Sequence, residues 1–323
     1  DNKTTAEASK DAVINYSNIP LQKGIQIIPC GLLSEVGIHT AKPKVKYWEE
    51  TPVFFETEVG DIPFDIFSAA FYLLSRYEEY TTESTFDKHG RFLHTHSLAF
   101  ENNFLQKPIV DIWIKQLKTL LLAKYPKLKP STPSFFLIPT IDIDNLFAYK
   151  YRGLLRTAGA TFRDAVSGKF TTLMHRLRVV CGLETDPYNN IKEVVALHKQ
   201  FKILPIFFLH FGDYGAHDKY AIFPNKEWKA FGRTFQRPYT VGLHPSYKAA
   251  VDWEQLKKEK KRMEATVGVN ANICRYHFLR FRLPVSYRWL LKARIREDFS
   301  MAYADALGFR ASTCFPFYFY DLL

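Results

Sequence analysis

The chain has 323 residues, of which 47% are hydrophobic and 24% charged, a composition typical of a globular protein with one large or two smaller domains. No apolar run approaches the roughly 18 residues that a membrane helix needs, so we expect no membrane span. Lysine and arginine number 44 against 33 aspartates and glutamates, but the basic residues are scattered and carry no nucleic-acid-binding motif. We therefore expect no nucleic acid partner.

The four cysteines are widely spaced and form no C-x-x-C pair, which argues against a zinc finger, a redox motif or a disulfide scaffold. Reduced thiols in a cytoplasmic protein are the simplest interpretation. The sequence opens at Asp1 without an initiating methionine, so a signal peptide that has been removed stays open as an alternative. The sequence gives no indication of the oligomeric state.

The first part of the chain predicts a small α+β domain over residues 1–130. Apolar residues at helical spacing predict a helix from Asp61 to Tyr80, with Pro63 in its first turn. A second helix is expected from about Val110 to Lys124. Three prolines between Tyr125 and Pro133 then end the helical pattern and mark the domain boundary.

The second domain, residues 131–323, alternates apolar runs with helices. The expected strands are Phe135–Ile138 leading into Asp144, Pro205–Leu209, Tyr239–Leu243, Ile273–Phe278, Phe299–Tyr303 and Phe309–Tyr320. Such alternation predicts a parallel sheet with crossover helices, here an incomplete or seven-stranded (β/α) barrel. An open, doubly wound sheet is the alternative.

Two of the crossover helices have recognisable ends. Asp186 is placed to cap the helix before the second strand, with Pro187 at its first position. Trp253 to Val267 forms the helix between the third and fourth strands, and Gly268 can terminate it. The charged run from Lys257 to Arg262 is interpreted as the solvated face of that helix.

Polar side chains close three of the predicted strands. Asp142 and Asp144 end the first strand, His244 follows the third, and Arg275 and His277 lie on the fourth. Ligands bind at the carboxyl ends of parallel strands, and alternation puts each of these pairs on one face. Two carboxylates at one strand end favour a divalent cation, and imidazole with carboxylate suits zinc or another first-row metal.

These segments resemble the motifs of the polysaccharide deacetylase family. Thr140–Asp144 resembles its first motif, Val241–His244 its second, and Arg275–His277 takes the place of its arginine-containing third motif. Arg296–Tyr303 and Gly308–Thr313 resemble a divergent branch that carries an additional N-terminal domain. The resemblance covers most of the chain.

The resemblance implies metal-assisted deacetylation of an N- or O-acetylated oligo- or polysaccharide. Asp142 would be the general base, and Asp144 with His244 would hold the metal, expected to be zinc. Arg275 would orient the base or the sugar. Further substrate contacts are assigned to Tyr247, Asp298 and Arg310.

The chain departs from the family pattern at three places. Ile143 separates the two aspartates, and Lys248 stands where the family has a second histidine ligand. We expect His277 to replace that ligand, with weak or absent metal binding as the alternative. The sequence stops at Leu323, so we expect the last strand, with the family's general-acid histidine, to be missing from it.

A second function stays open for these reasons. A protein that kept the deacetylase fold but lost catalysis would bind carbohydrate or act as a scaffold. The residues also have structural interpretations: Asp142 and Asp144 as helix caps or arginine partners, His244 as a turn histidine, and Arg275, Asp298 and Arg310 as members of ion pairs.

Overall fold

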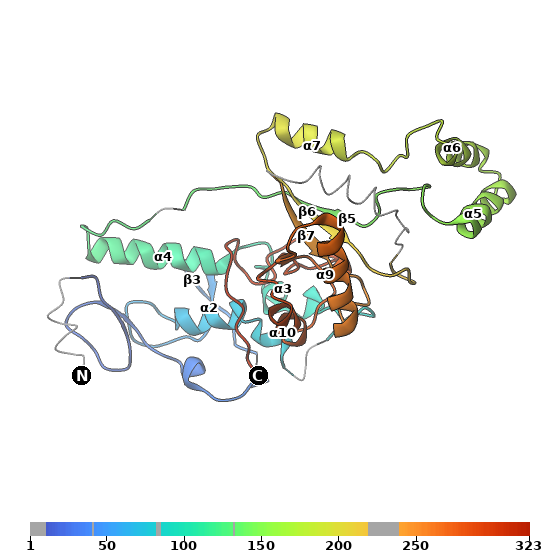
Figure 1. Cartoon of the computed structure of the whole chain (residues 1–323). Coiled ribbons are helices and arrows are strands. Elements are labelled where there is room, and N and C mark those ends of the chain that lie inside the picture. Colours follow the sequence, from blue (N-terminus) through green and yellow to red (C-terminus); the bar gives the residue numbers. More distant parts are fainter. Residues whose placement is uncertain (1–10, 41, 82–84, 132, 219–238) are drawn as a thin grey trace. The chain divides into compact units, whose positions relative to one another are not determined.

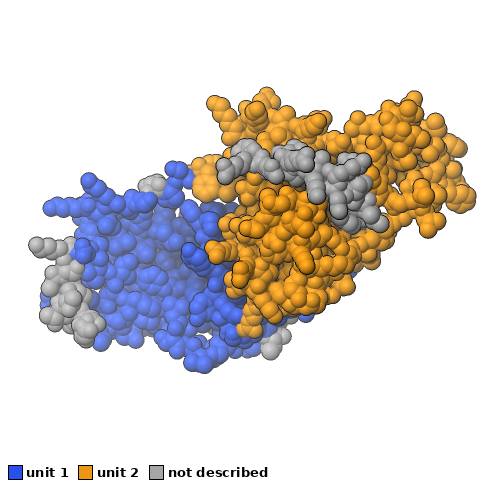
Figure 2. Space-filling view, viewed as in Figure 1, with its two compact units in different colours: residues 1–134, 282–287, 301–323 blue, residues 135–281, 288–300 orange. Residues whose placement is uncertain are grey.

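The computed structural model describes residues 11–40, 42–81, 85–131, 133–218 and 239–323 (Figure 1). The chain forms two compact units, which Figure 2 shows in different colours. Unit 1 comprises residues 1–134, 282–287 and 301–323, and unit 2 comprises residues 135–281 and 288–300. Residues 301–323, assigned to the second domain from the sequence, thus cluster with the first unit.

Short strands and helices make up the first part of unit 1. A parallel ladder joins β1 to β2, and an antiparallel ladder joins β3 to β4. The elements in chain order are β1 (Ile14–Tyr16), β2 (Ile25–Ile27), η1 (Leu32–Ser34), β3 (Lys46–Trp48), β4 (Thr51–Val53), α2 (Ile66–Leu74), η2 (Tyr77–Glu79), η3 (His94–His96), α3 (Leu98–Glu101) and α4 (Ile109–Lys124).

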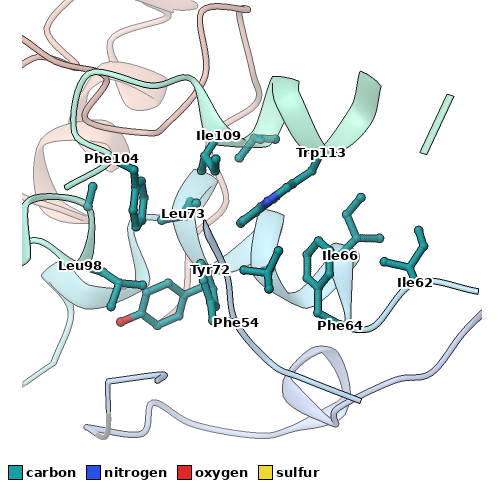
Figure 3. Packing of buried hydrophobic residues seen from close by; sticks show 14 of the residues in the cluster. Phe54, Ile62, Phe64, Ile66, Tyr72, Leu73, Leu98, Phe104, Ile109 and Trp113 are labelled. Atoms are coloured by element: carbon teal, nitrogen blue, oxygen red, sulfur yellow. The ribbon is translucent and has the colours of Figure 1, made fainter. Parts of the chain in front are cut away.

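The core of unit 1 is aromatic and is closed by α2 and α4. Trp113 on α4 is fully buried and packs edge-on against Phe54 with ring centroids 5.5 Å apart (Figure 3). Its indole N–H donates to the Pro52 carbonyl at 2.9 Å, which satisfies the one polar group of the side chain. The predicted helix at Val110–Lys124 is confirmed, since α4 runs from Ile109 to Lys124.

The predicted helix at 61–80 is shorter than expected. α2 begins only after Asp65, whose carboxylate accepts from the backbone N–H groups of Phe67 and Ser68 at 3.2 and 3.0 Å. This side-chain cap fixes the start of the helix, so Pro63 lies outside it. The helix ends at Leu74, and a separate 3₁₀ turn follows.

Unit 2 is built on a five-stranded sheet in which every neighbouring pair is parallel. The elements beyond residue 134 are β5 (Thr140–Ile143), α5 (Leu154–Val166), α6 (Phe170–Val180), α7 (Ile191–Gln200), β6 (Ile206–His210), β7 (Thr240–His244), α9 (Trp253–Val267), β8 (Ile273–Cys274), η4 (His277–Leu279), α10 (Val285–Lys292) and β9 (Glu297–Asp298). Helices α5, α6 and α10 were not expected from the sequence.

The strand order confirms a parallel α/β architecture. The sheet runs β5-β6-β7-β8-β9, so each strand lies beside the next one in the chain. A doubly wound sheet would reverse direction at a switch point, whereas sequential order is typical of a (β/α) barrel. Among the described residues β5 and β9 are edge strands, and closure into a barrel is not observed.

The first predicted strand is displaced along the chain. β5 begins at Thr140, and Phe135 is 92% exposed. Pro139 has no N–H to donate to a neighbouring strand. Its carbonyl accepts from Ile206 N, at the point where the pairing of β5 with β6 begins. The apolar run Phe135–Ile138 was therefore wrongly assigned to the strand.

The last two predicted strands also differ from the structure. β9 occupies residues 297–298, just before the expected strand, because Glu297 and Asp298 are in register with β8. No strand forms in the described segment Phe309–Tyr320. There the carboxylate of Asp111 instead accepts from the Thr313 hydroxyl at 2.6 Å and the Cys314 N–H at 2.8 Å, which holds the segment as a loop.

Helix α9 follows the prediction from end to end. It runs from Trp253 to Val267, and Gly268 ends it in a left-handed conformation with φ of 79°. One expectation on it was wrong: Glu259, inside the charged run, is fully buried rather than solvated. The helix packs against β7. The strands of this part of the sheet are buried, as the fully buried side chains of Phe207, Phe208 and Leu243 show.

Asp186 does not cap a helix. α7 begins at Ile191, and the carboxylate of Asp186 accepts from the backbone N–H groups of Ala148, Tyr149 and Lys150 at 2.7 to 3.0 Å. Three backbone donors outcompete the one or two that a helix start offers. Asp186 thus fixes the segment that follows β5.

Gly242 marks a close contact between neighbouring strands of the sheet. Gly242 in β7 has no space for a side chain, since a Cβ there would lie 2.6 Å from Phe208 and 2.7 Å from Ile273. The missing side chain lets neighbouring strands pack closely.

No helix among the described residues is both long and apolar enough to cross a bilayer.

Candidate metal and catalytic site

The strand ends of unit 2 bring three of the predicted residues together. Asp144 directly follows β5, His244 is the last residue of β7, and His277 opens the 3₁₀ turn η4 after β8. Parallel neighbours present their carboxyl ends at one edge, which is why residues 144, 244 and 277 meet. The expectation that Arg275 and His277 lie on the strand was wrong, because β8 ends at Cys274.

The side chains of these three residues converge on one point. The Oδ1 atom of Asp144 lies 3.2 Å from His244 Nε2 and 3.4 Å from His277 Nδ1. The two imidazole nitrogens are 3.0 Å apart. His244 is 2% exposed, whereas the side chain of Asp144 is 49% exposed. The cluster is therefore anchored in the protein and open on the aspartate side.

Hydrogen bonds on the far side of each ring fix which nitrogen faces the cluster. His244 Nδ1 lies 2.6 Å from the carbonyl of Arg275 and donates to it, since a carbonyl can only accept. In the neutral ring the lone pair is therefore on Nε2, the nitrogen that faces Asp144. His277 hydrogen-bonds in turn to the backbone of His217. This arrangement, with the distal N–H held by a carbonyl, is characteristic of histidines that bind a metal.

The charges of the cluster are strongly coupled. Burial by itself raises the pKa of Asp144, but hydrogen bonds from His244 and His277 outweigh it and hold that pKa well below its ordinary value. For His277 burial lowers the pKa, and the Asp144 carboxylate outweighs it and raises the pKa overall. Acceptor atoms meet here without enough hydrogens between them, so the cluster favours a cation, either a proton or a metal ion.

Asp142 and Arg275 form a second pair beside the cluster. Asp142 is on β5, two residues before Asp144, and its Oδ2 lies 3.5 Å from Arg275 Nε. The other end of the guanidinium donates to the hydroxyl of Thr140 at 2.6 Å. Arg275 thus holds a half-exposed carboxylate in place without burying it, which leaves Asp142 accessible to a water molecule.

A buried carboxylate supports the loop that carries His244. Glu259 on α9 accepts from the Ser246 N–H at 2.8 Å and from Gln255 Nε2 at 2.8 Å, and it also binds the Ser246 hydroxyl. Burial raises the pKa of Glu259 to about 7, against the lowering effect of these hydrogen bonds. Sequence reasoning missed this residue, although its position between Leu256 and Met263 on the buried face of the helix was a usable signal.

His210 is a second residue that sequence reasoning missed. It ends β6 in register with His244, and its Nδ1 lies 3.2 Å from the His244 carbonyl, to which it donates. Its Nε2 lies 3.7 Å from the buried Asp218. Burial, with the nearby His244 and His277, lowers the pKa of His210 to about 3, so the ring is neutral. The signal was available, since a histidine closes the apolar run that ends at Leu209.

The residues expected to contact the substrate contact other groups of the protein instead. The ring of Tyr247 is occupied by neighbours, with His217 at 4.1 Å and the Arg280 guanidinium at 3.9 Å from its centroid. Asp298 accepts from the Ser300 hydroxyl at 2.6 Å and from the Ser300 N–H at 3.0 Å. It therefore acts as a local cap of the chain after β9.

Arg310 belongs to unit 1 and is 3% exposed. Both its Nε and its Nη2 donate to the carboxylate of Glu79, at 2.8 and 2.6 Å. The structural interpretation is the one that the geometry favours, and we leave Arg310 out of the proposed site. Lys248, in turn, points away into solvent and lies 3.5 Å from Asp252, so it does not occupy the place of a ligand.

Comparisons with known proteins cover only parts of the chain. Residues 1–126 match the family described as "Family of unknown function (DUF7033)". No curated protein matches the chain. Among solved structures, the chain is similar to a protein from Mycobacterium smegmatis described as "putative polysaccharide deacetylase", with 14% identity and a TM-score of 0.30. That match covers 53% of this chain and 55% of the other, so the chain spans about half the length of the solved structure.

Proposed function

We propose that this protein is a metal-dependent hydrolase that removes the acetyl group from an N- or O-acetylated carbohydrate. The observation that carries the proposal is the meeting of His244 Nε2, His277 Nδ1 and Asp144 Oδ1, whose mutual distances are 3.0, 3.2 and 3.4 Å. Two imidazoles and a carboxylate are a common ligand set of catalytic zinc, which keeps its remaining position open for water or substrate.

The geometry of the three residues fits a divalent ion. Ligand atoms around a tetrahedral ion with bonds of about 2.1 Å lie about 3.4 Å apart, close to the distances found here. Both rings are oriented by backbone groups, as ligands of a resident metal are. His277 thus supplies the third ligand that Lys248 does not provide.

Asp144, His244 and His277 would hold the divalent ion, which would lower the pKa of water to about 7 and polarise an acetyl carbonyl. The residues around it have separate tasks in the proposed reaction. Asp142 accepts the proton of the attacking water, since its carboxylate is exposed and lies on β5, two residues before Asp144. Arg275 orients that carboxylate and is itself fixed by Thr140. Arg275 is therefore a positioning residue.

The carbohydrate class of the substrate rests on the motifs at 140–144, 241–244 and 275–277, which resemble those of polysaccharide deacetylases. The competing proposal is a catalytically silent protein of the same fold that binds carbohydrate. The two differ at Asp142, because a silent protein has no use for an exposed carboxylate held by Arg275 next to the candidate metal ligands.

The test is acetate release from a panel of N- and O-acetylated oligosaccharides by zinc-loaded full-length protein. We expect D142N to lose at least about 100-fold in rate while its zinc affinity stays within about threefold of the wild type. H244A should lose both zinc and activity. If the wild type binds zinc but releases no acetate from any member of the panel, the silent alternative is supported. If the wild type binds no divalent ion, both the metal site and the reaction are refuted.

A further inference from the structure

A pair of helices between β5 and α7 exposes apolar side chains in an unusual pattern. Helix α5 carries Leu154, Leu155, Phe162 and Val166, which are 91%, 91%, 71% and 72% exposed. At 100° per residue these four side chains lie within one sector of about 120°. The helix therefore has a continuous apolar face, and that face is turned to the solvent.

The opposite side of α5 is the one that packs. Asp164 is 6% exposed and forms an ion pair with Arg176 on α6, and the two helices lie against each other. A helix of a globular protein normally buries its apolar face and exposes its charges. Here the arrangement is inverted, so packing within unit 2 does not account for the apolar residues of α5.

Helix α6 continues the same surface. Phe170, Met174 and Leu177 recur at spacings of four and three residues, and they are 65%, 54% and 38% exposed. Leu183, just after the helix, is 76% exposed. Patches of this extent rarely lie uncovered on a soluble protein, and they mark a surface that meets another molecule or a membrane.

The charge of the helix pair indicates which kind of partner it meets. Residues 154–184 contain five lysines and arginines against two acids, Asp164 and Glu184, which pair with Arg176 and Arg178, so the helix pair has an excess of three positive charges. Arg163 and Lys169 are exposed near the edge of the apolar face. A second copy of the chain would bring equal positive charge and be repelled, whereas an anionic surface is attracted.

We propose that the α5–α6 helix pair lies in the surface of a bilayer that contains anionic lipids, with the apolar face of residues 154–183 inserted among the acyl chains. An amphipathic helix with apolar residues on one side and lysine or arginine beside them is the form that binds such surfaces. The inference is independent of the proposed deacetylase chemistry. The helix pair follows β5, the strand before Asp144, after ten residues, so binding would bring the sheet close to the bilayer.

Co-sedimentation of the full chain with vesicles tests the proposal. We expect binding to vesicles of phosphatidylcholine and phosphatidylglycerol in a 3:1 ratio, little binding to pure phosphatidylcholine, and weaker binding as salt is raised. L155S/F162S should lower the partition coefficient by at least about tenfold. R163Q/K169Q should lower it less and flatten its salt dependence.

A matched control removes two equally exposed apolar side chains elsewhere. Val36 and Leu307 in unit 1 are 96% and 84% exposed, and V36S/L307S should bind vesicles like the wild type. All these positions are exposed, so circular dichroism should be unchanged. Wild-type protein that ignores anionic vesicles at low salt would overturn the proposal. So would a dimer in light scattering that L155S/F162S converts to monomers, because a second copy would then cover the face.

Discussion

Two clusters of opposite charges, one in each unit, differ in how completely their hydrogen bonds are satisfied. In unit 1 Arg76 and Arg310 lie with Glu78 and Glu79, all nearly fully buried. In unit 2 Asp144 meets His244 and His277 at a half-exposed edge. Both contain acids and bases within hydrogen-bonding distance, and only one of them is suited to chemistry.

The unit 1 cluster is balanced and closed. Arg76 donates to Glu78 and Glu79 at 2.7 and 2.8 Å, Arg310 donates twice to Glu79, and Glu78 also accepts from Leu98 N at 2.8 Å. Burial alone would raise the pKa of Glu79, but Arg310 and Arg76 outweigh it and lower the pKa. Two cations match two anions, and fixed donors occupy the carboxylate oxygens.

The unit 2 cluster is unbalanced and open. His244 Nδ1 is held by the Arg275 carbonyl, and His244 Nε2, His277 Nδ1 and Asp144 Oδ1 face one another. A ring nitrogen that faces a carboxylate and a second ring nitrogen at 3.0 to 3.4 Å needs a cation between them. An exposed edge where a carboxylate and two imidazoles share a place for a proton or a metal ion, rather than the density of charge, distinguishes a candidate site from a structural ion pair.

The largest effect is expected from breaking the closed cluster. R310M leaves Glu79 buried with half of its cationic partners, which should lower the free energy of unfolding by about 3–5 kcal/mol. Urea denaturation measures this effect. K46A removes one partner of the exposed pair Lys46–Glu56 and should cost at most about 1 kcal/mol. Equal losses for the two variants would contradict the structural role of the buried cluster.

Opening the unit 2 cluster should act on metal affinity. H277A removes one of three ligand atoms and should weaken zinc binding by at least about 100-fold, while the stability of the metal-free protein changes little. Competition with a chromophoric chelator gives the affinity. In the same assay, without denaturant, R310M should bind zinc like the wild type. A zinc affinity that is unchanged in H277A would exclude His277 as a ligand.

The buried Glu259 gives a pH dependence of stability. Its pKa in the folded protein is about 7, above its ordinary value of 4.5, so the folded state holds the proton more tightly than the unfolded state. The stability that this group contributes is therefore complete below about pH 4.5 and is lost as the pH rises through 7. E259Q cannot ionise, and relative to the wild type it should gain on the order of 2 kcal/mol between pH 4.5 and 8.

Unfolding curves of wild type and E259Q at several pH values measure that difference. The matched control is E264Q on the same helix, where Glu264 is partly exposed and pairs with Lys260. A difference between E259Q and wild type that stays constant with pH would show that Glu259 ionises normally.

The smallest effect is expected at Lys248. It stands where the resemblance places a ligand, yet its side chain is 63% exposed and pairs with Asp252. K248A should therefore change zinc affinity by less than about twofold. A loss comparable to that of H277A would place Lys248 in the site and require another arrangement of the loop after β7.

The sequence predicted the strand ends well where a residue's place follows from periodicity. His244 closes β7, and α9 runs from Trp253 to Val267 with Gly268 after it as expected, because an uninterrupted helical pattern and a left-handed glycine are local signals. Phe135–Ile138 failed as a strand, since an apolar run does not reveal whether a neighbouring strand pairs with it. Burial depends on tertiary partners.

The candidate site shows the same division. Asp144 and His244 were identified from the ends of their strands, whereas the position of His277 depends on a 3₁₀ turn in which Phe278 has a φ of 63°. No local sequence pattern predicts that turn. Glu259 looked like one charge among many, and only the packing of α9 against the loop of Ser246 reveals its role. Arg310 could not be assigned, because its partner Glu79 is 231 residues away.

A crystal structure of zinc-soaked protein, with data collected at the zinc absorption edge, tests the central claim most directly. The account predicts one anomalous peak within bonding distance of His244 Nε2, His277 Nδ1 and an oxygen of Asp144, with the His244 Nδ1 still hydrogen-bonded to the Arg275 carbonyl. A peak bound by other residues, or no peak with the two rings turned apart, would contradict it.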